Sequence, residues 1–238
     1  GRDAGRNITT GSSNICIGQN AADADDHTGV TAVGSFTLSS NTADYNTAIG
    51  YFASRLNTSG VSNTAVGSNA LEANTTGGYN TALGRASLIT NTTASNNTAL
   101  GYAALYANTT GASNTAVGTQ SLDANTTGAD NTAVGKGALG ANTTASFNTA
   151  IGVDSLRDNT TGSNNVSMGV NAALTSTGSQ NVAIGNNTFR GTSNSGSNST
   201  AIGYNSLNAN TTGTQNTAVG SNALDANTTA SYNTAVGY

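Results

Sequence analysis

A five-residue segment that ends in glycine recurs along the whole chain and constrains its fold more than any other feature. One copy is Asn63–Gly67, with the sequence NTAVG, and its closing glycine returns every 16 to 18 residues, most often every 17. The closing glycines are Gly1, Gly18, Gly34, Gly50, Gly67, Gly84, Gly101, Gly118, Gly135, Gly152, Gly169, Gly185, Gly203, Gly220 and Gly237. Because the repeat runs through all 238 residues, the chain is first of all an array of internal repeats.

The composition favours stacked repeats over an ordinary globular core. Aromatic residues make up 5% of the chain and charged residues 8%, and there is no proline and no tryptophan. Intrinsically disordered chains usually carry a high net charge, whereas the formal net charge here is only −4. Small apolar faces at regular intervals can be buried if each repeat covers the next, which is the arrangement of a solenoid.

The segment before each closing glycine has the alternation of a short β-strand. Thr64 and Val66 stand two residues apart, so they share one face of the strand, and Ala65 lies on the other face. The alanine position accepts only alanine, serine (Ser167) or cysteine (Cys16), which indicates tight packing against it. We therefore predict a strand that is covered on both faces.

A second apolar position stands four residues after the closing glycine, and the residue before it is always small. We predict that this position, usually leucine, fills the core from a second strand that faces the first. The predicted core residues are Val66, Leu71, Leu83, Leu88, Leu100, Leu105, Val117, Leu122, Val134 and Leu139.

Asparagine and threonine follow the leucine in most repeats, as in Asn74-Thr75-Thr76. Stacked asparagine side chains can form hydrogen bonds from one coil to the next, and β-branched threonine suits extended backbone. We expect the closing glycines, together with glycines such as Gly77 and Gly128, to form corners with positive φ.

Two strands and two corners in 17 residues predict an all-β fold, a parallel β-roll (β-solenoid) of about fourteen coils. We expect residues 1–238 to form a single repeat array and a segment of a longer fibrous protein. The period slips between residues 18 and 50 and between 169 and 203, so irregular loops are expected at Asp23–His27 and at Gly191–Asn198. The predicted core is thin, and we expect the roll to bury a further face in an oligomer.

With these repeats described, the segment Gln180–Gly185, QNVAIG, resembles the N-S-V-A-I-G signature of trimeric autotransporter adhesin heads. Asn14–Gly18 and the copies of N-T-A-[VIL]-G are similar to it, and related arrays occur in phage tail fibres. The resemblance implies a left-handed, homotrimeric β-roll on a cell or virion surface, with an adhesive role.

Little in the sequence indicates catalysis, a cofactor or nucleic-acid binding. Seven Lys and Arg residues are scattered over the repeats without a basic stripe, and no apolar run is long enough to span a membrane. Asp23, Asp25, Asp26 and His27 are the best metal candidates, but they lack known Ca²⁺-loop spacings, so we favour an exposed acidic loop. His27 is the only histidine, and Cys16 fills the small alanine position, as a buried, unreactive thiol would. We predict a protein that is not an enzyme and that has no cofactor.

Several surface patterns leave alternatives open. Tyr45, Tyr79, Phe147 and Tyr232 each stand five residues before a closing glycine, and they form either a subunit interface or a strip that binds glycan. The Asn-Thr-Thr segments are also N-glycosylation sequons, although we favour the coil-to-coil asparagine ladder. Regular threonine rows leave ice binding as a more distant possibility.

These observations predict a non-catalytic structural or adhesive segment of an extracellular fibre or surface adhesin. One alternative is a subunit of an extracellular filament that stacks through uncapped solenoid ends. A further alternative is a solenoid that binds glycan or ice. The expected partners are other copies of the chain, as a trimer or a filament, and a host-surface glycan or protein.

Overall fold

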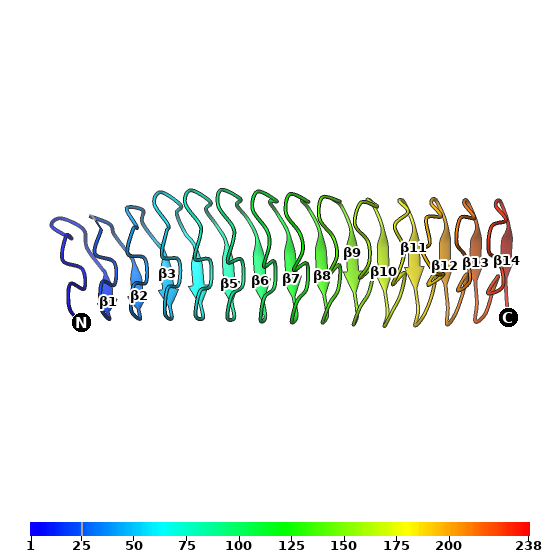
Figure 1. Cartoon of the computed structure of the whole chain (residues 1–238), viewed down its shortest axis with the longest axis horizontal. Coiled ribbons are helices and arrows are strands. Elements are labelled where there is room, and N and C mark those ends of the chain that lie inside the picture. The colour runs from blue at the N-terminus through cyan, green and yellow to red at the C-terminus, as the bar shows by residue number, and fades with distance from the viewer. Residues whose placement is uncertain (25) are drawn as a thin grey trace. The chain divides into compact units, whose positions relative to one another are not determined.

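The computed structural model describes residues 1–24 and 26–238, and it divides into two compact units, Gly1–Thr119 (unit 1) and Gln120–Tyr238 (unit 2). Each unit is a stack of coils, and each strand-bearing coil has one three-residue strand (Figure 1). Unit 1 contains β1 (Ile15–Ile17), β2 (Thr31–Val33), β3 (Thr47–Ile49), β4 (Thr64–Val66), β5 (Thr81–Leu83), β6 (Thr98–Leu100) and β7 (Thr115–Val117). Unit 2 contains β8 (Thr132–Val134), β9 (Thr149–Ile151), β10 (Val166–Met168), β11 (Val182–Ile184), β12 (Thr200–Ile202), β13 (Thr217–Val219) and β14 (Thr234–Val236). The described residues contain no helix.

Within each unit, every strand pairs in parallel with the next strand along the chain. The repeats align position by position, so that Thr64 pairs with Thr81, Ala65 with Ala82 and Val66 with Leu83. The prediction of an all-β, parallel β-solenoid with coils of about 17 residues is therefore confirmed. Its left-handedness stays a prediction.

The strand turns its alanine toward the interior of the coil. Ala65, Ala82 and Ala99 have no exposed surface. The opposite wall of the coil is within hydrogen-bonding distance at this level, because the Ser155 hydroxyl donates to the Ser167 hydroxyl across 2.8 Å. Only a small side chain fits between two walls that lie so close, which explains why both positions are restricted to small residues.

The residue before each closing glycine points away from this interior, so half of the predicted core is wrong. Leu83 and Leu100 are 42% and 41% exposed. Val66, Val117 and Val134 are half-buried. The physical reason is the narrow interior, which takes the alanine face of the strand and leaves the larger side chains outside. Within a single chain, the strand is covered on one face only.

The leucines of the predicted core are completely buried, but they do not lie on a second strand. Leu71, Leu88, Leu105, Leu122 and Leu139 have no exposed surface. Their φ angles lie between 51° and 54°, and the residue two places before each leucine also has a positive φ. Backbone that alternates in this way forms a tight turn instead of a strand, and each coil therefore has one strand and a compact turn.

The asparagine ladder predicted from the sequence is present. The Asn74 side-chain amide donates to Asn57 Oδ1 across 2.7 Å, and Asn91 donates to Asn74 across 2.8 Å. Each amide also donates to a carbonyl oxygen in its own coil, as from Asn74 to Gly77 across 2.8 Å. These side chains are completely buried, so the ladder supplies hydrogen bonds that buried amides require.

A second asparagine ladder, which was not predicted from the sequence, runs through the residue that opens each repeat. The backbone N–H of Asn80 donates to Asn63 Oδ1 across 2.9 Å, and that of Asn97 donates to Asn80 Oδ1 across 3.0 Å. The side-chain amide of Asn63 donates to the Gly77 carbonyl across 2.9 Å. The near-constant asparagine at the first motif position was the available signal for this ladder.

The closing glycines are required by two constraints. From Gly18 to Gly237 their φ angles lie between 126° and 136°, a region that side chains disfavour. In addition, a Cβ atom on Gly67 would lie 2.6 Å from the carbonyl oxygen of Gly84 in the next coil. The prediction of positive φ is wrong for Gly77 and Gly128, because the left-handed residue of that corner stands two positions later, at Tyr79 and Asp130.

Irregular loops were expected at Asp23–His27 and at Gly191–Asn198. Asp25 lies outside the described residues. The Gly191–Asn198 tract keeps its place in the stack of unit 2, because the Ser195 N–H donates to the Thr211 carbonyl across 2.7 Å and the Asn198 N–H donates to the Ser179 carbonyl across 3.0 Å.

Candidate functional site

The outward side of the strands presents a regular surface, which we call the outer strand face. It consists of a threonine column and an aliphatic column, such as Thr98 and Leu100 in β6, and it extends to the residue after each closing glycine, such as Tyr102. The exposed apolar residues on it are Ile15, Ile17, Ile49, Tyr51, Leu83, Leu100 and Tyr102 in unit 1, and Ile151, Val153, Met168, Val170, Ile202, Tyr204, Val236 and Tyr238 in unit 2. Contiguous exposed apolar surface of this kind is typical of interaction sites.

Tyrosine follows the closing glycine in several coils of both units. Tyr51, Tyr102 and Tyr204 are 49% to 53% exposed, and each stands two residues after an exposed aliphatic residue of the strand. Their large side chains, two residues after the last strand position, were the available signal, but the sequence did not show that this strand position faces outward.

The four aromatic residues five places before a closing glycine lie in one column of each unit. In unit 1 this column, which we call the Tyr79 column, contains Ser13, Gly29, Tyr45, Ser62, Tyr79, Asn96 and Ser113. Tyr45 and Tyr79 are two coils apart, with Ser62 between them. Phe147 and Tyr232 belong to the equivalent column of unit 2 and are five coils apart. The four rings therefore do not form one continuous stack. Within unit 1, Tyr45 and Tyr79 lie in the same column, two coils apart.

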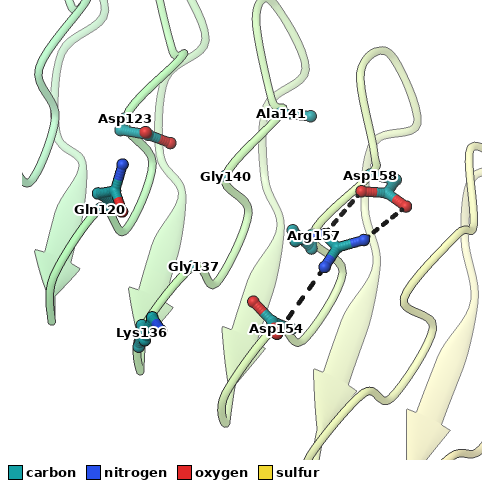
Figure 2. A pocket seen from close by; sticks show the side chains of 9 residues that line it. All are labelled: Gln120, Asp123, Lys136, Gly137, Gly140, Ala141, Asp154, Arg157 and Asp158. Atoms are coloured by element: carbon teal, nitrogen blue, oxygen red, sulfur yellow. Dashed lines mark hydrogen bonds and ion pairs between the residues drawn. The ribbon is translucent and has the colours of Figure 1, made fainter.

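Unit 2 contains a hollow of about 330 Å³ beside the turns of three successive coils (Figure 2). Its middle coil has glycine at both positions where other coils carry side chains, Gly137 and Gly140. Its remaining lining residues are Gln120, Asp123, Lys136, Ala141, Asp154, Arg157 and Asp158. The hollow thus exists because two side chains are missing from one coil.

Most charges in the hollow are already satisfied within it. Arg157 Nε lies 2.8 Å from Asp158 Oδ1, and Arg157 Nη1 lies 3.8 Å from Asp154 Oδ2. The ion pair with Asp158 raises the pKa of the Arg157 guanidinium. Desolvation raises the pKa of the Asp123 carboxyl, and hydrogen bonds from backbone N–H groups and from Gln120 oppose this effect in part. The arrangement is a local ion-pair network, with no nucleophile placed beside a base.

The metal candidates near the N-terminus are engaged separately from one another. The Asp26 carboxylate accepts hydrogen bonds from the backbone N–H groups and hydroxyls of Thr9 and Thr10. These bonds hold the pKa of the Asp26 carboxyl well below its usual value. Asp23 accepts a hydrogen bond from Asn20 across 2.9 Å, and His27 is buried. Among residues 1–24 and 26–238, no three His, Cys, Asp or Glu side chains are grouped closely enough to hold a metal ion.

Cys16 occupies the inward-facing position of β1 and is half-buried. Burial raises the pKa of its thiol, which lowers the thiolate fraction needed for nucleophilic chemistry. The sequon asparagines Asn74 and Asn108 have no exposed surface. Their side chains belong to the asparagine ladder and are inaccessible to a glycosyltransferase in the folded coil.

A scan against models of known protein families, and searches among characterised proteins and solved structures, match nothing to this chain. The relationship to adhesin heads that Gln180–Gly185 suggests therefore stays a prediction. No helix in the described part of the chain is long and apolar enough to cross a membrane.

Proposed function

We propose that this chain is a non-catalytic structural and adhesive segment of an extracellular fibre, and that copies associate through the outer strand face. The observation that carries the proposal is the in-register column of exposed aliphatic side chains, including Ile49, Leu83 and Leu100 in unit 1. A column that repeats with every coil can be covered along its whole length by the same column of a second copy. The extracellular location and the trimeric state rest on the resemblance to adhesin heads.

The proposal is also consistent with which residues stabilise the fold. The buried positions carry alanine, leucine and two ladders of asparagine, so each coil packs mainly on its neighbours. A filament that grows by stacking of coil ends is the alternative, and it would leave the outer strand face uncovered.

Light scattering on the native protein tests the assembly. We expect a discrete mass of three chains for the native sequence and a mass near one chain for the double variant Leu83→Lys and Leu100→Lys, because a charge buried in an apolar interface is costly. The matched control is Leu56→Lys with Tyr106→Lys, which adds the same charge at exposed apolar residues away from the outer strand face. The control should keep the mass of the native protein.

Each other outcome decides against a part of the proposal. A native protein that stays at the mass of one chain would exclude self-association. Long fibres that persist in the Leu83 and Leu100 variant would favour end-to-end stacking instead. Equal loss of assembly in both double variants would show that added charge, and not the outer strand face, controls the mass.

A further inference from the structure

The Tyr79 column of unit 1 holds bulky residues in an unfavourable backbone conformation. Tyr45 and Tyr79 have φ angles of 59° and 60°. Glycine and asparagine adopt this left-handed region most readily, and it is uncommon for bulky side chains. Other coils of unit 1 place Gly29, Ser62 or Asn96 at the same position. A tyrosine in this position therefore costs stability that the fold itself does not require.

Neither tyrosine gains burial in return. Tyr45 is 64% exposed and Tyr79 is 63% exposed. Among the described residues, no ring contact, hydrogen bond or ion pair involves either side chain. The Tyr45 ring is nevertheless seated on the column, because a Cβ atom on Gly29 would lie 2.8 Å from its Cδ1 atom. Residues held in such strained backbone conformations cluster at sites that bind ligands or switch between states, and both rings are exposed.

The stacking of the coils fixes the spacing of these rings. The Tyr45 N–H donates to the Thr28 carbonyl and the Tyr79 N–H to the Val61 carbonyl, each across 3.0 Å, so both are held in the same register. Coils follow one another at about 4.8 Å, the spacing of hydrogen-bonded strands. The two rings are thus two coils apart, and the polar side chains of Ser62 and Asn96 occupy the coils between and after them.

We propose that the Tyr79 column binds an extended β-1,4-linked polysaccharide of the cellulose or chitin type, with one sugar unit per coil. In such a chain each pyranose ring advances by nearly one coil spacing, and alternate rings present the same face. Tyr45 and Tyr79 would then stack on alternate sugars, and Ser62 and Asn96 would form hydrogen bonds with the hydroxyls or amides of the others. This inference rests on the proposed adhesive role and names its ligand class.

Depletion of the protein from solution by microcrystalline cellulose and by chitin tests the proposal. The key variant is Tyr45→Asn with Tyr79→Asn, because Asn96 shows that the column accepts asparagine. We expect binding to at least one polymer, weakened about tenfold or more in this variant if each ring contributes as much as an aromatic pair does. Tyr106→Asn removes an exposed tyrosine outside the column and should bind as the native protein does.

A gain of affinity provides a stricter test of the spacing. Ser113 lies two coils after Tyr79, so Ser113→Tyr adds a third ring in phase, whereas Asn96→Tyr adds a ring one coil out of phase. Only the Ser113 variant should bind more tightly. The proposal is overturned if the native protein binds neither polymer, if it binds α-linked amylose equally well, or if the double asparagine variant binds unchanged.

The same variants separate this proposal from the assembly proposed above. The Tyr79 column is not part of the outer strand face, so the mass of the double asparagine variant should equal that of the native protein. A fall in mass would show that these rings cover a subunit contact, and the polysaccharide proposal would then fail. Loss of binding with an unchanged mass supports it.

Discussion

At the scale of single residues, the fold depends on side chains that hold unfavourable backbone conformations. Leu71 and Leu88 have φ angles of 54° and 51° and no exposed surface. A left-handed conformation costs about 1–2 kcal/mol per residue, and full burial of a leucine contributes about 1.5–3 kcal/mol. Burial therefore offsets the strain at leucine, whereas it does not at the exposed Tyr45 and Tyr79.

Asp123 in the hollow of unit 2 gives a pH-dependent prediction at this scale. Desolvation raises the pKa of its carboxyl, so the folded state favours the neutral form. The resulting stability is present below the pKa of the unfolded chain, about 3.9, and is lost as pH rises through the folded-state pKa. Asp123→Asn should thus match the native protein at acidic pH and be more stable at neutral pH, by less than about 1 kcal/mol because the side chain is partly exposed.

Urea unfolding midpoints from pH 3 to pH 8 measure this difference. The control Asp130→Asn removes one negative charge from an exposed position and measures the effect of losing a charge alone. A native protein that is more stable than Asp123→Asn at neutral pH would contradict the prediction, because the hydrogen bonds to the carboxylate would then outweigh its desolvation.

At the scale of the coil, the sequence predicts the position of the strand and of the buried leucine but not which way the strand faces. The alternation of Thr98, Ala99 and Leu100 is equally consistent with either face turned inward, and hydrophobicity alone favours leucine. The short distance between the two walls of the coil determines which face of the strand points inward. This distance depends on contacts between residues twelve apart in the chain, such as Ser155 and Ser167. The left-handed turn was missed because leucine in that conformation contradicts its intrinsic preference.

The candidate site was predicted less completely than the fold, because the sequence does not show which side chains point outward. The sequence identifies Tyr45 and Tyr79 as a recurring position but gives neither their strain nor their exposure. The outer strand face could not be predicted before the inward direction of alanine was known. Its aliphatic residues, such as Leu83, were placed in the core instead.

Substitution of Ala99 tests the direction of the strand. Valine has a higher strand propensity than alanine, so strand propensity alone predicts that Ala99→Val stabilises the chain. The structure predicts a loss of about 1–3 kcal/mol, the usual effect of overpacking, because the methyl groups would meet the opposite wall near Ser87. Chemical denaturation measures the change, and Thr98→Val on the outward side, which should be nearly neutral, is the control. Equal effects of the two substitutions would contradict the inward orientation of alanine.

At the scale of the whole chain, repeated coils in register should be interchangeable, because each one packs mainly on its neighbours. Deletion of Arg85–Gly101 removes one full period and joins Gly84 to Tyr102, which stands at the same phase. We expect this variant to fold with an unchanged far-ultraviolet circular dichroism spectrum per residue. Its urea m-value should fall by about one part in fourteen, because m scales with the surface exposed on unfolding.

Deletion of only residues 85–92 is the contrasting variant. It joins Gly84 to Thr93, so the later side chains would meet the wrong columns and the asparagine ladder through Asn74 and Asn108 would lose its link at Asn91. We expect this shorter deletion to unfold or aggregate although it removes fewer residues. If both deletions were tolerated equally, the coil register would not govern stability, and if both failed, the coils would not be interchangeable. Retention of structure by the full-period deletion alone would show that the 17-residue period is the unit of folding.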